Sequence, residues 1–578
     1  MGLTDSGLTV RQDYGAAEDQ PPTISSTPAP SFTEGSTDTY NMTTHVSDDG
    51  LSTVTYSLSN TLPDGLTFNT STGFLSYDGL GVPSISQHQL TATDAVGSAT
   101  SSSFDIRIVT TAYTATHYVD VYANVDGASD DYSDQGSSSW SNATSSSTPT
   151  TLGTAMANAI AGNQVQAAPG VIPGSTVGPG HRHLSDFMPT NSGTPDNSIV
   201  FFAQYPAAAN HGSTELYTEM RKQNTEGSTV GAGSSDYIVF DGFYFDENFN
   251  LPANDGGILM LGSGSTGIEA RRCSFLRTGA SDTHGAYGTG DNKNPIFFHR
   301  SIDSKILDCR FEGNPGVGAH KNNAVINIYD SASYTIEHNL FIGNAFSIYH
   351  KESGIGGLDP APYRQSGVTR YNHFYQCGNV SMMQQGITQD VSYNLYEDCT
   401  GNDGIIQTDS GPDRAGSQTW TFTHNTLVSP GTASGFYMEP NVDWTSGMVF
   451  QDNIVYATSG MSGGAGFVDS YADQGGDITE WTWTQWTIDN NCYYSPGAYA
   501  WYGRENDGGD TTIGAWRSQT GQEANSIITD PEFTSVGGRN FTLASNGQDA
   551  LTASSTNGPV GCYITGNEEI GMRANPSY

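Results

Sequence analysis

The feature that most constrains the fold is a short motif, ending in Asn-x-Phe or a variant of it, that recurs from about residue 236 onward. Successive copies align Asn339, Asn372, Asn394, Asn425, Asn453 and Asn491. Cys273 and Cys309 take this place in the first two copies, and the copies lie 22 to 38 residues apart. Such self-similarity is typical of a solenoid built from one turn per repeat. Because adjacent strands lie about 4.8 Å apart, the Asn amides can form a ladder. The repeat predicts a right-handed parallel β-helix.

Composition agrees with an all-β fold. Apolar runs are short and alternate with Gly, Asn, Asp and Ser clusters, and only 14% of the residues are charged. The formal net charge of −39 argues against nucleic acid as a partner, because phosphate binding needs Lys and Arg. The same charge suits a protein that is soluble in salt, such as one from a marine source. No apolar run approaches the roughly 20 residues of a membrane span. Six Cys in 578 residues are too few for a disulfide framework, so the aligned pairs Cys273/Cys309 and Cys377/Cys399 are predicted to be apolar thiol stacks, although a disulfide would fit their spacing.

Three regions follow from the local patterns. Residues 1–22 form a polar lead-in, and residues 23–110 contain short strands separated by turn sequences such as Pro63-Asp64-Gly65. LPDGLTFNTSTGFLS, followed by LTATDAVGSA, resembles immunoglobulin-like and cadherin-like modules of bacterial surface proteins, which implies a small β-sandwich. Residues 111–578 are predicted to form the β-helix, with a capping helix over Thr151–Ala161 and a C-terminal part, Ile527–Ala550, that resembles the end of secreted β-helix enzymes.

Metal binding is predicted at one place only. Asp48, Asp49 and Asp94 could bind calcium as in cadherins, but Asx turns are the favoured interpretation. No other cofactor is expected. The sequence opens without a basic segment followed by an apolar one, so no secretory signal is predicted. This favours release on a virus particle, with a secreted enzyme that has lost its leader as the alternative.

One strand of each β-helix turn is predicted to line a groove for a polymer. Period-two alternation places Phe298, Ile328, Ile348, Met383 and Ile406 inside. The outward column then contains His299, Tyr329, Tyr349, Gln384 and Gln407. Aromatic faces and amides suit sugar binding, and the alternative is an ordinary polar surface.

The segment HNLFIGNAFSIYHKESG, with the RYNHF and SYNLY repeats after it, resembles the lyase family that holds chondroitinase B and many alginate lyases. Lys351 matches the base lysine of that family. Gln384-Gln385-Gly386 stands where the family has Arg-His-Gly, and Asn344 and Phe346 stand where it has acidic calcium ligands. The resemblance therefore implies a polysaccharide lyase fold and carries over Lys351 alone.

Elimination from a uronic acid needs a base, an acid and a group that neutralises the carboxylate. The sequence predicts a catalytic group of Tyr349, His350 and Lys351, in which Lys351 is the base and Tyr349 protonates the leaving oxygen. Substrate binding is assigned to His299, Arg300, Tyr329, Asp330, Arg370, Gln384 and Gln407. His299, Arg300, His350, Lys351 and Arg370 would form a local cationic patch for an acidic glycan. The alternative for Lys351 is a surface pair with Glu352.

Two other functions stay open. A glycoside hydrolase needs two carboxylates, and Asp409 and Glu439 on consecutive turns would lie about 5 Å apart, as in a retaining pair; Asp330 and Asp413 are further candidates. A non-catalytic adhesin would bind glycan without cutting it. The leading hypothesis is an extracellular depolymerase of an acidic bacterial or algal polysaccharide that resembles phage tail spikes, which are usually trimers.

Overall fold

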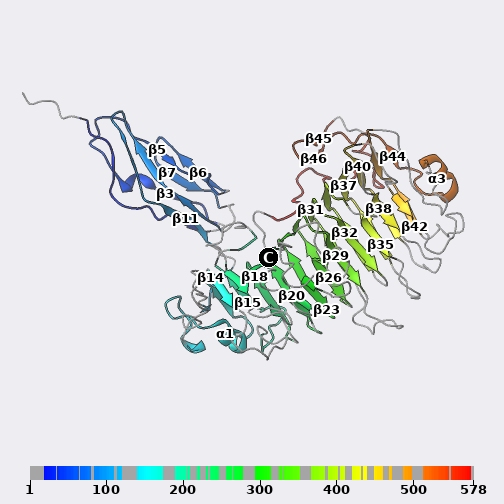
Figure 1. The fold of residues 1–578 in the computed structure, drawn as a ribbon, viewed down its shortest axis with the longest axis horizontal. Coiled ribbons are helices and arrows are strands. Elements are labelled where there is room, and N and C mark those ends of the chain that lie inside the picture. The colour runs from blue at the N-terminus through cyan, green and yellow to red at the C-terminus, as the bar shows by residue number, and fades with distance from the viewer. Residues whose placement is uncertain are drawn as a thin grey trace, which may run out of the picture. The chain divides into compact units, whose positions relative to one another are not determined.

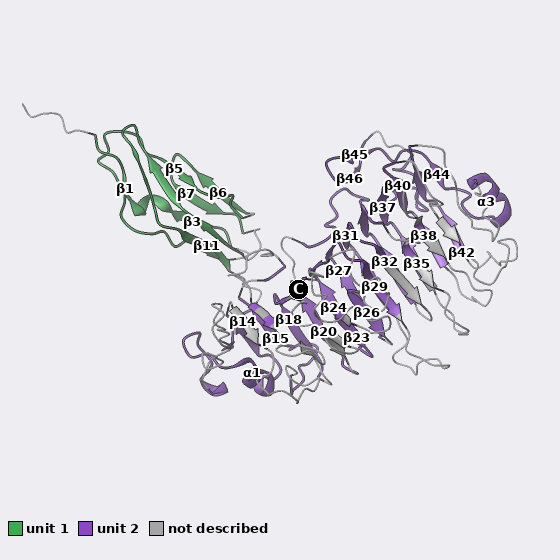
Figure 2. Ribbon diagram, viewed as in Figure 1, with its two compact units in different colours: residues 1–111 green, residues 112–578 purple. Residues whose placement is uncertain are grey.

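The computed structural model describes residues 19–109 and 113–573 except for internal gaps. The gaps are 34–35, 64, 80–83, 120–138, 169, 174–188, 205, 209–217, 222–229, 232–234, 247–255, 263, 277–292, 314–323, 330, 352–365, 385–387, 401–403, 410–418, 431–433, 439–447, 460–467, 471–485, 497–511 and 546–548. The chain divides into two compact units, Met1–Thr111 and Ala112–Tyr578 (Figure 2).

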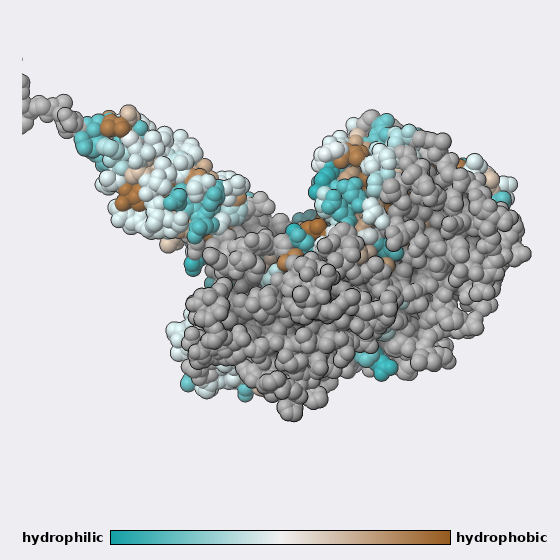
Figure 3. Space-filling view, in the orientation of Figure 1, coloured by the Kyte–Doolittle hydropathy of each residue, from teal (hydrophilic) through white to brown (hydrophobic). Residues whose placement is uncertain are grey.

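The first unit is a small all-β domain with its own core. Its elements are β1(Thr23–Ile24), β2(Ser31–Thr33), β3(Asp38–Asn41), η1(Met42–His45), β4(Val46–Ser47), β5(Thr55–Leu58), β6(Leu66–Asn69), β7(Phe74–Tyr77), β8(Ser84–His88), β9(Leu90–Thr93), β10(Ser98–Thr100) and β11(Phe104–Val109). Within the described residues they form the sheets β10-β9-β5, β2-β11-β8, β3-β7-β6 and β1-β4. Met42, Leu75, Leu90 and Ile106 are fully buried between them. Leu51, Phe74 and Val96 are exposed large apolar side chains of this unit, and Figure 3 shows small hydrophobic and hydrophilic areas on a surface of mostly intermediate hydropathy.

The second unit is a parallel β-helix in which successive turns add one strand to each of three parallel sheets (Figure 1). Sheet I contains β12(His117–Val119), β13(Gln164–Ala167), β15(Ile199–Ala203), β18(Ile238–Asp241), β21(Glu269–Arg271), β24(Lys305–Leu307), β27(Tyr334–Glu337), β30(Ser366–Arg370), β33(Thr388–Ser392), β36(Thr419–Thr423), β39(Met448–Gln451) and β42(Trp486–Asp489). Sheet II contains β14(Gly170–Pro173), β16(Thr218–Arg221), β19(Tyr244–Asp246), β22(Ser274–Leu276), β25(Arg310–Glu312), β28(Leu340–Ile342), β31(His373–Tyr375), β34(Leu395–Glu397), β37(Thr426–Ser429), β40(Ile454–Ala457), β43(Cys492–Tyr494) and β44(Ile527–Ile528). Sheet III contains β17(Val230–Gly231), β20(Gly256–Gly262), β23(Lys293–His299), β26(Ile326–Tyr329), β29(Phe346–Lys351), β32(Asn379–Gln384), β35(Gly404–Asp409), β38(Ser434–Met438) and β41(Val468–Ser470).

Short helices pack against the solenoid core toward either end. The 3₁₀ turn η3(Trp140–Asn142) precedes α1(Leu152–Asn158), which is the helix predicted over Thr151–Ala161. Thr151 caps α1 by accepting a hydrogen bond from the Thr154 amide, and Leu152 and Met156 join the core. Toward the other end, α3(Ile513–Thr520) buries Trp516 in the same core. Such helices cover apolar rungs that would otherwise end in water.

The predicted Asn ladder is present at the corner between sheets I and II. Each Asn side chain donates through Nδ2 to the Oδ1 of the next, at 2.9 to 3.1 Å from Asn339 to Asn491. The same Oδ1 atoms also accept the backbone amide of the preceding ladder residue, and Cys309 donates its amide to Asn339 in this way. The residue before each ladder position has a positive φ, as in Tyr371 at 56° and Tyr393 at 57°. The amides thus support a left-handed corner that non-glycine residues rarely adopt.

An aromatic stack lies on the inner face of sheet II and overlaps the Asn ladder at β28, β31 and β34. It consists of Phe245, Phe275, Phe311, Phe341, Phe374 and Tyr396, with ring centroids 4.6 to 5.0 Å apart. These distances match the spacing of neighbouring strands, so each ring lies over the one below it. All six cysteines are buried and free, as the thiol interpretation predicted.

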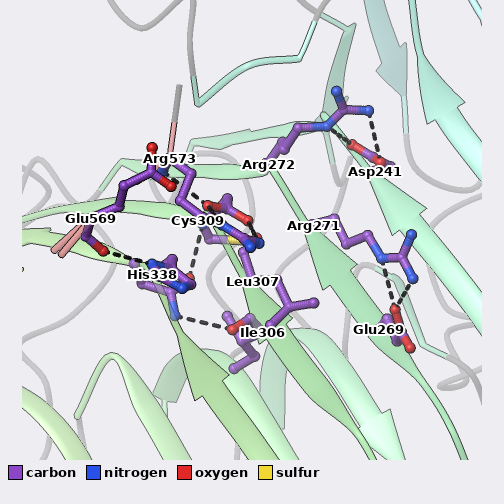
Figure 4. Close-up of polar contacts among 12 residues, drawn as sticks. Asp241, Glu269, Arg271, Arg272, Ile306, Leu307, Cys309, His338, Glu569 and Arg573 are labelled. Carbon is purple, nitrogen blue, oxygen red and sulfur yellow. Dashed lines mark hydrogen bonds and ion pairs between the residues drawn. The ribbon is translucent and has the colours of Figure 1, made fainter. Parts of the chain in front are cut away.

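The C-terminal segment, residues 549–573, runs back along the ladder corner. Its contacts include Ser555 Oγ to Asp452 at 2.7 Å, the Gly571 amide to the Tyr371 carbonyl at 2.7 Å and Arg573 to Asp308 at 2.6 Å. Figure 4 shows the last of these beside the bond between His338 and the Glu569 carbonyl, at 2.9 Å. β45(Phe533–Ser535) and β46(Asn540–Leu543) pack on the outer face of sheet II, where Arg539 pairs with the buried Glu397. The segment therefore joins turns that are distant in sequence.

Replacing Asn394 by Leu should lower the free energy of unfolding by about 1–3 kcal/mol, because it leaves buried amide and carbonyl partners of Asn372 and Asn425 unpaired. Denaturant unfolding measures this, with the exposed Asn142→Leu as the control. Equal stability of the two variants would contradict the ladder's role.

Glu523 should make stability depend on pH. It is fully buried, accepts a hydrogen bond from the Tyr493 hydroxyl at 2.6 Å, and burial raises its pKa from 4.5 to about 7. The folded state therefore binds the proton of Glu523 more strongly than the unfolded state does. The resulting contribution to the free energy of unfolding is complete below about pH 4.5 and is lost as the pH rises through about 7. Glu523→Gln should remove a decline on the order of 3 kcal/mol across this range. Glu569→Gln, at an exposed site, serves as the control, and an unchanged pH profile in Glu523→Gln would contradict the assignment.

Candidate functional site

Sheet III positions the residues that the sequence assigned to catalysis. Register pairs His299 with Tyr329, and Tyr329 with Lys351. His350 pairs with Met383, which places Lys351 beside Gln384, and Gln384 pairs with Asp409. Five neighbouring strands thus align one column, which we call the Lys351 column: His299, Tyr329, Lys351, Gln384 and Asp409.

This register corrects the predicted one. The sequence alignment placed Ile348 beside Ile328, whereas the structure pairs Ile328 with His350. Tyr349 and Gln407 consequently lie in a second column, two residues earlier along their strands, with Phe297, Asn327 and Met382. A shift of two residues keeps every side chain on its face, so alternation of apolar residues could not detect it.

His350 lies inside the solenoid, and its predicted position on the groove face is wrong. Its side chain is fully buried, and Nδ1 lies 2.7 Å from the hydroxyl of Tyr334 on sheet I. Burial lowers the pKa of His350 to about 3, because charge is costly in the core. The imidazole is therefore neutral near pH 7 and forms part of the core.

Tyr349 points away from His350 by strand alternation, yet it is only 1% exposed and packs against Ala324 and Phe346. Tyr329 is 7% exposed. The centroid of the Phe297 ring lies 5.8 Å from that of His299 and 5.3 Å from that of Tyr329, so Phe297 packs against two members of the Lys351 column. Sequence reasoning missed Phe297, although its alternation with His299 is visible in IFFHR.

The predicted cationic patch does not assemble as expected. Arg370 ends β30 on sheet I, not on sheet III, and forms an ion pair with Glu337 of the adjacent strand. The outer face of sheet I carries similar pairs, as Lys305 and Arg271 both contact Glu269. Arg300 is exposed at the corner after His299, with φ of 53°. Carboxylates on the same face therefore balance the charge of Arg370, which corrects its assignment to the substrate acid.

Some predicted site residues lie outside the described part of the chain, and others are located only by the pairing of their backbones. Asp330, Asp413 and Glu439 lie outside the described residues. Lys351, Gln384, Gln407 and Asp409 are located by their backbone pairing alone. The carboxylate pair of the hydrolase alternative stays a prediction.

The acidic residues of the first unit form Asx turns. Asp48 accepts the Gly50 amide at 2.9 Å, Asp49 accepts the Leu51 amide at 3.0 Å, and Asp94 accepts the Val96 and Gly97 amides at 2.8 Å. Among the residues that the structure describes, no three or more His, Cys, Asp or Glu side chains are grouped to hold a metal ion. In that same part of the chain, no helix has the length and apolar character needed to span a membrane.

Comparison with known proteins gives one family match and several similar folds. Residues 21–109 match the family model described as "Putative Ig domain". A PL6 family polysaccharide lyase from Pseudopedobacter saltans has a TM-score of 0.40 and 10% identity, covering 73% of this chain and 97% of its own. Pectate lyase Pel9A has a TM-score of 0.36 and 12% identity, covering 77% and 93%. A Yersinia enterocolitica family 28 exopolygalacturonase has a TM-score of 0.34 and 13% identity, covering 76% and 82%. No curated protein matches the chain.

Proposed function

We propose that this protein is an extracellular depolymerase that binds an acidic polysaccharide across sheet III and cuts it by β-elimination near Lys351. The Lys351 column carries the proposal. It aligns an amine, a phenol, an imidazole, an amide and a carboxylate on adjacent strands of one rigid sheet. Because parallel strands lie about 4.8 Å apart, Tyr329 and Gln384 on the two strands beside Lys351 are within reach of the same sugar unit.

The proposed chemistry assigns one role to each neighbour of Lys351. The amine of Lys351 removes the proton beside the sugar carboxylate, provided that its surroundings lower its pKa. The Tyr329 phenol, on the adjacent strand, protonates the leaving oxygen, in place of the Tyr349 that the sequence suggested. Gln384 on the other side binds the carboxylate, and His299 and Arg300, two strands away from Lys351, bind a neighbouring sugar unit.

A hydrolase on the same sheet is the second candidate. Asp409 belongs to the Lys351 column, and Glu439 follows β38, which ends at Met438, in the sequence. Two carboxylates on adjacent strands would support a retaining mechanism.

A glycan-binding adhesin is the third candidate. Release on a phage tail, as a trimer, remains our proposal for the biological setting, with secretion as the alternative.

Lys351→Ala should lower kcat/KM on the cut glycan by at least about 100-fold, a loss of roughly 2.7 kcal/mol of transition-state stabilisation. The matched control is Lys305→Ala, which removes a lysine on sheet I that pairs with Glu269. Viscosity of alginate, polygalacturonate and bacterial exopolysaccharide solutions follows the cutting. A Lys351→Ala protein that keeps more than about a tenth of wild-type activity while Asp409→Asn is inactive would support the hydrolase instead.

The first unit should be dispensable for cutting. Its buried core is separate from that of the β-helix, and the division falls between Thr111 and Ala112. A protein that consists of residues 112–578 should stay folded and keep kcat within about twofold of the full chain on short soluble glycans. Circular dichroism checks folding. A folded but inactive truncated protein would contradict this.

A further inference from the structure

A polar cluster lies in the solenoid core behind the strand that carries Lys351. Tyr334, His350 and Gln389 are all at most 1% exposed, and they come from β27, β29 and β33. The Tyr334 hydroxyl is 2.7 Å from His350 Nδ1, and both polar atoms of the buried Gln389 side chain have no hydrogen-bond partner within the described part of the chain. The cluster joins sheet I to sheet III across the interior.

Burying this polar cluster reduces stability, because the aligned inward positions on the neighbouring strands are apolar. On the two preceding strands, the inward positions aligned with His350 are Phe298 and Ile328. His350 Nε2 is buried and has no hydrogen-bond partner among the residues that the structure describes, and leaving a buried polar group unpaired is destabilising. An apolar residue would avoid this cost. Buried polar groups of this kind can specify one register among several, as the single buried Asn of coiled coils does.

Burial of apolar side chains alone does not fix the register of β29. Ile348 on the inner face and Tyr349 on the outer face are both 1% exposed, so apolar burial does not distinguish the two faces. The strand is joined to β28 by a short corner at Asn344, whereas the next strand, β30, begins only at Ser366. A slip of one residue would turn Lys351 into the core and His350 out of it.

Gly367 makes room for the contact. A Cβ atom at this position would lie 2.3 Å from the Tyr334 ring, so the ring passes over the glycine backbone of the next turn. Residues with side chains, Tyr334 and Gln389, occupy the paired positions on either side. Glycine here allows the tyrosine orientation that reaches His350.

We propose that Tyr334 and His350 are positioning residues that hold β29 in the register that turns Lys351 out of the core. The proposal rests on the proposed function, because positioning matters only if Lys351 acts in the reaction. The hydrogen bond fixes the C-terminal end of β29 to sheet I, one residue before Lys351. Displacement of a reacting group by about 1 Å can cost about 100-fold in rate, so even partial loss of register reduces turnover.

The test compares Tyr334→Phe with a matched control, Tyr396→Phe. Tyr396 is also a fully buried core tyrosine, but no described residue forms a hydrogen bond with its hydroxyl. With whichever of alginate, polygalacturonate or chondroitin sulfate the wild-type protein cuts fastest, Tyr334→Phe should lower kcat at least about tenfold and leave KM within about threefold. Tyr396→Phe should change neither. Unchanged kcat in Tyr334→Phe overturns the proposal.

A double variant separates positioning from stability. Tyr334→Phe with His350→Leu replaces both partners by apolar groups, which is often neutral or stabilising. We expect its unfolding midpoint to recover to at least that of Tyr334→Phe while kcat stays low. Recovery of kcat together with stability would show a purely structural pair and overturn the proposal. Failure of the proposed function is distinguishable, because then the wild-type protein cuts none of the three glycans or Lys351→Ala stays active, and either result also overturns the positioning role.

Discussion

The hydrogen-bonded Asn ladder is the interaction on which the rest of the β-helix depends. Each ladder amide supports the left-handed corner of its own turn and bonds to the next turn, so one residue type fixes both the bend and the stacking. At β28, β31 and β34 the ladder corner is followed directly by stacked rings of sheet II, whose centroids keep the spacing of the strands. The C-terminal segment then crosses the same corner and ties its turns together. The regular corner leaves sheet III and its long connections free to vary.

The turns of the β-helix could be predicted from the sequence because the Asn motif recurs once in each turn. The ladder positions and the capping helix are found where the motif and the turn residues placed them. Sheet III was harder, since each strand is separated from the next by connections of different length. Strand alternation assigned the inner face of Phe298 and Ile328 correctly but could not fix how far one strand is shifted along another. His350 and Arg370 were misplaced for other reasons. Alternation from the inward Ile348 already turns His350 into the core, Arg370 lies on sheet I, and neither a core hydrogen bond nor a Glu337 ion pair has a local sequence pattern.

The corrected register changes the chemical content of the candidate site. Tyr329 replaces Tyr349 as the phenol nearest Lys351 in the aligned column, and Asp409 joins the same column through Gln384. A lysine, Lys351, and one carboxylate residue, Asp409, thus belong to the same column of sheet III. Elimination and hydrolysis make different demands on these groups, because the first needs an unprotonated amine and the second needs two carboxylates with different pKa values.

The chemistry of the products decides most directly between these accounts. After incubation with an acidic polysaccharide, ultraviolet absorbance and mass spectrometry of the fragments report which bond was made. We predict fragments that absorb through a new conjugated double bond and whose summed mass equals that of the starting chain. Fragments without this absorbance that have gained the mass of one water for each cut would contradict elimination at Lys351.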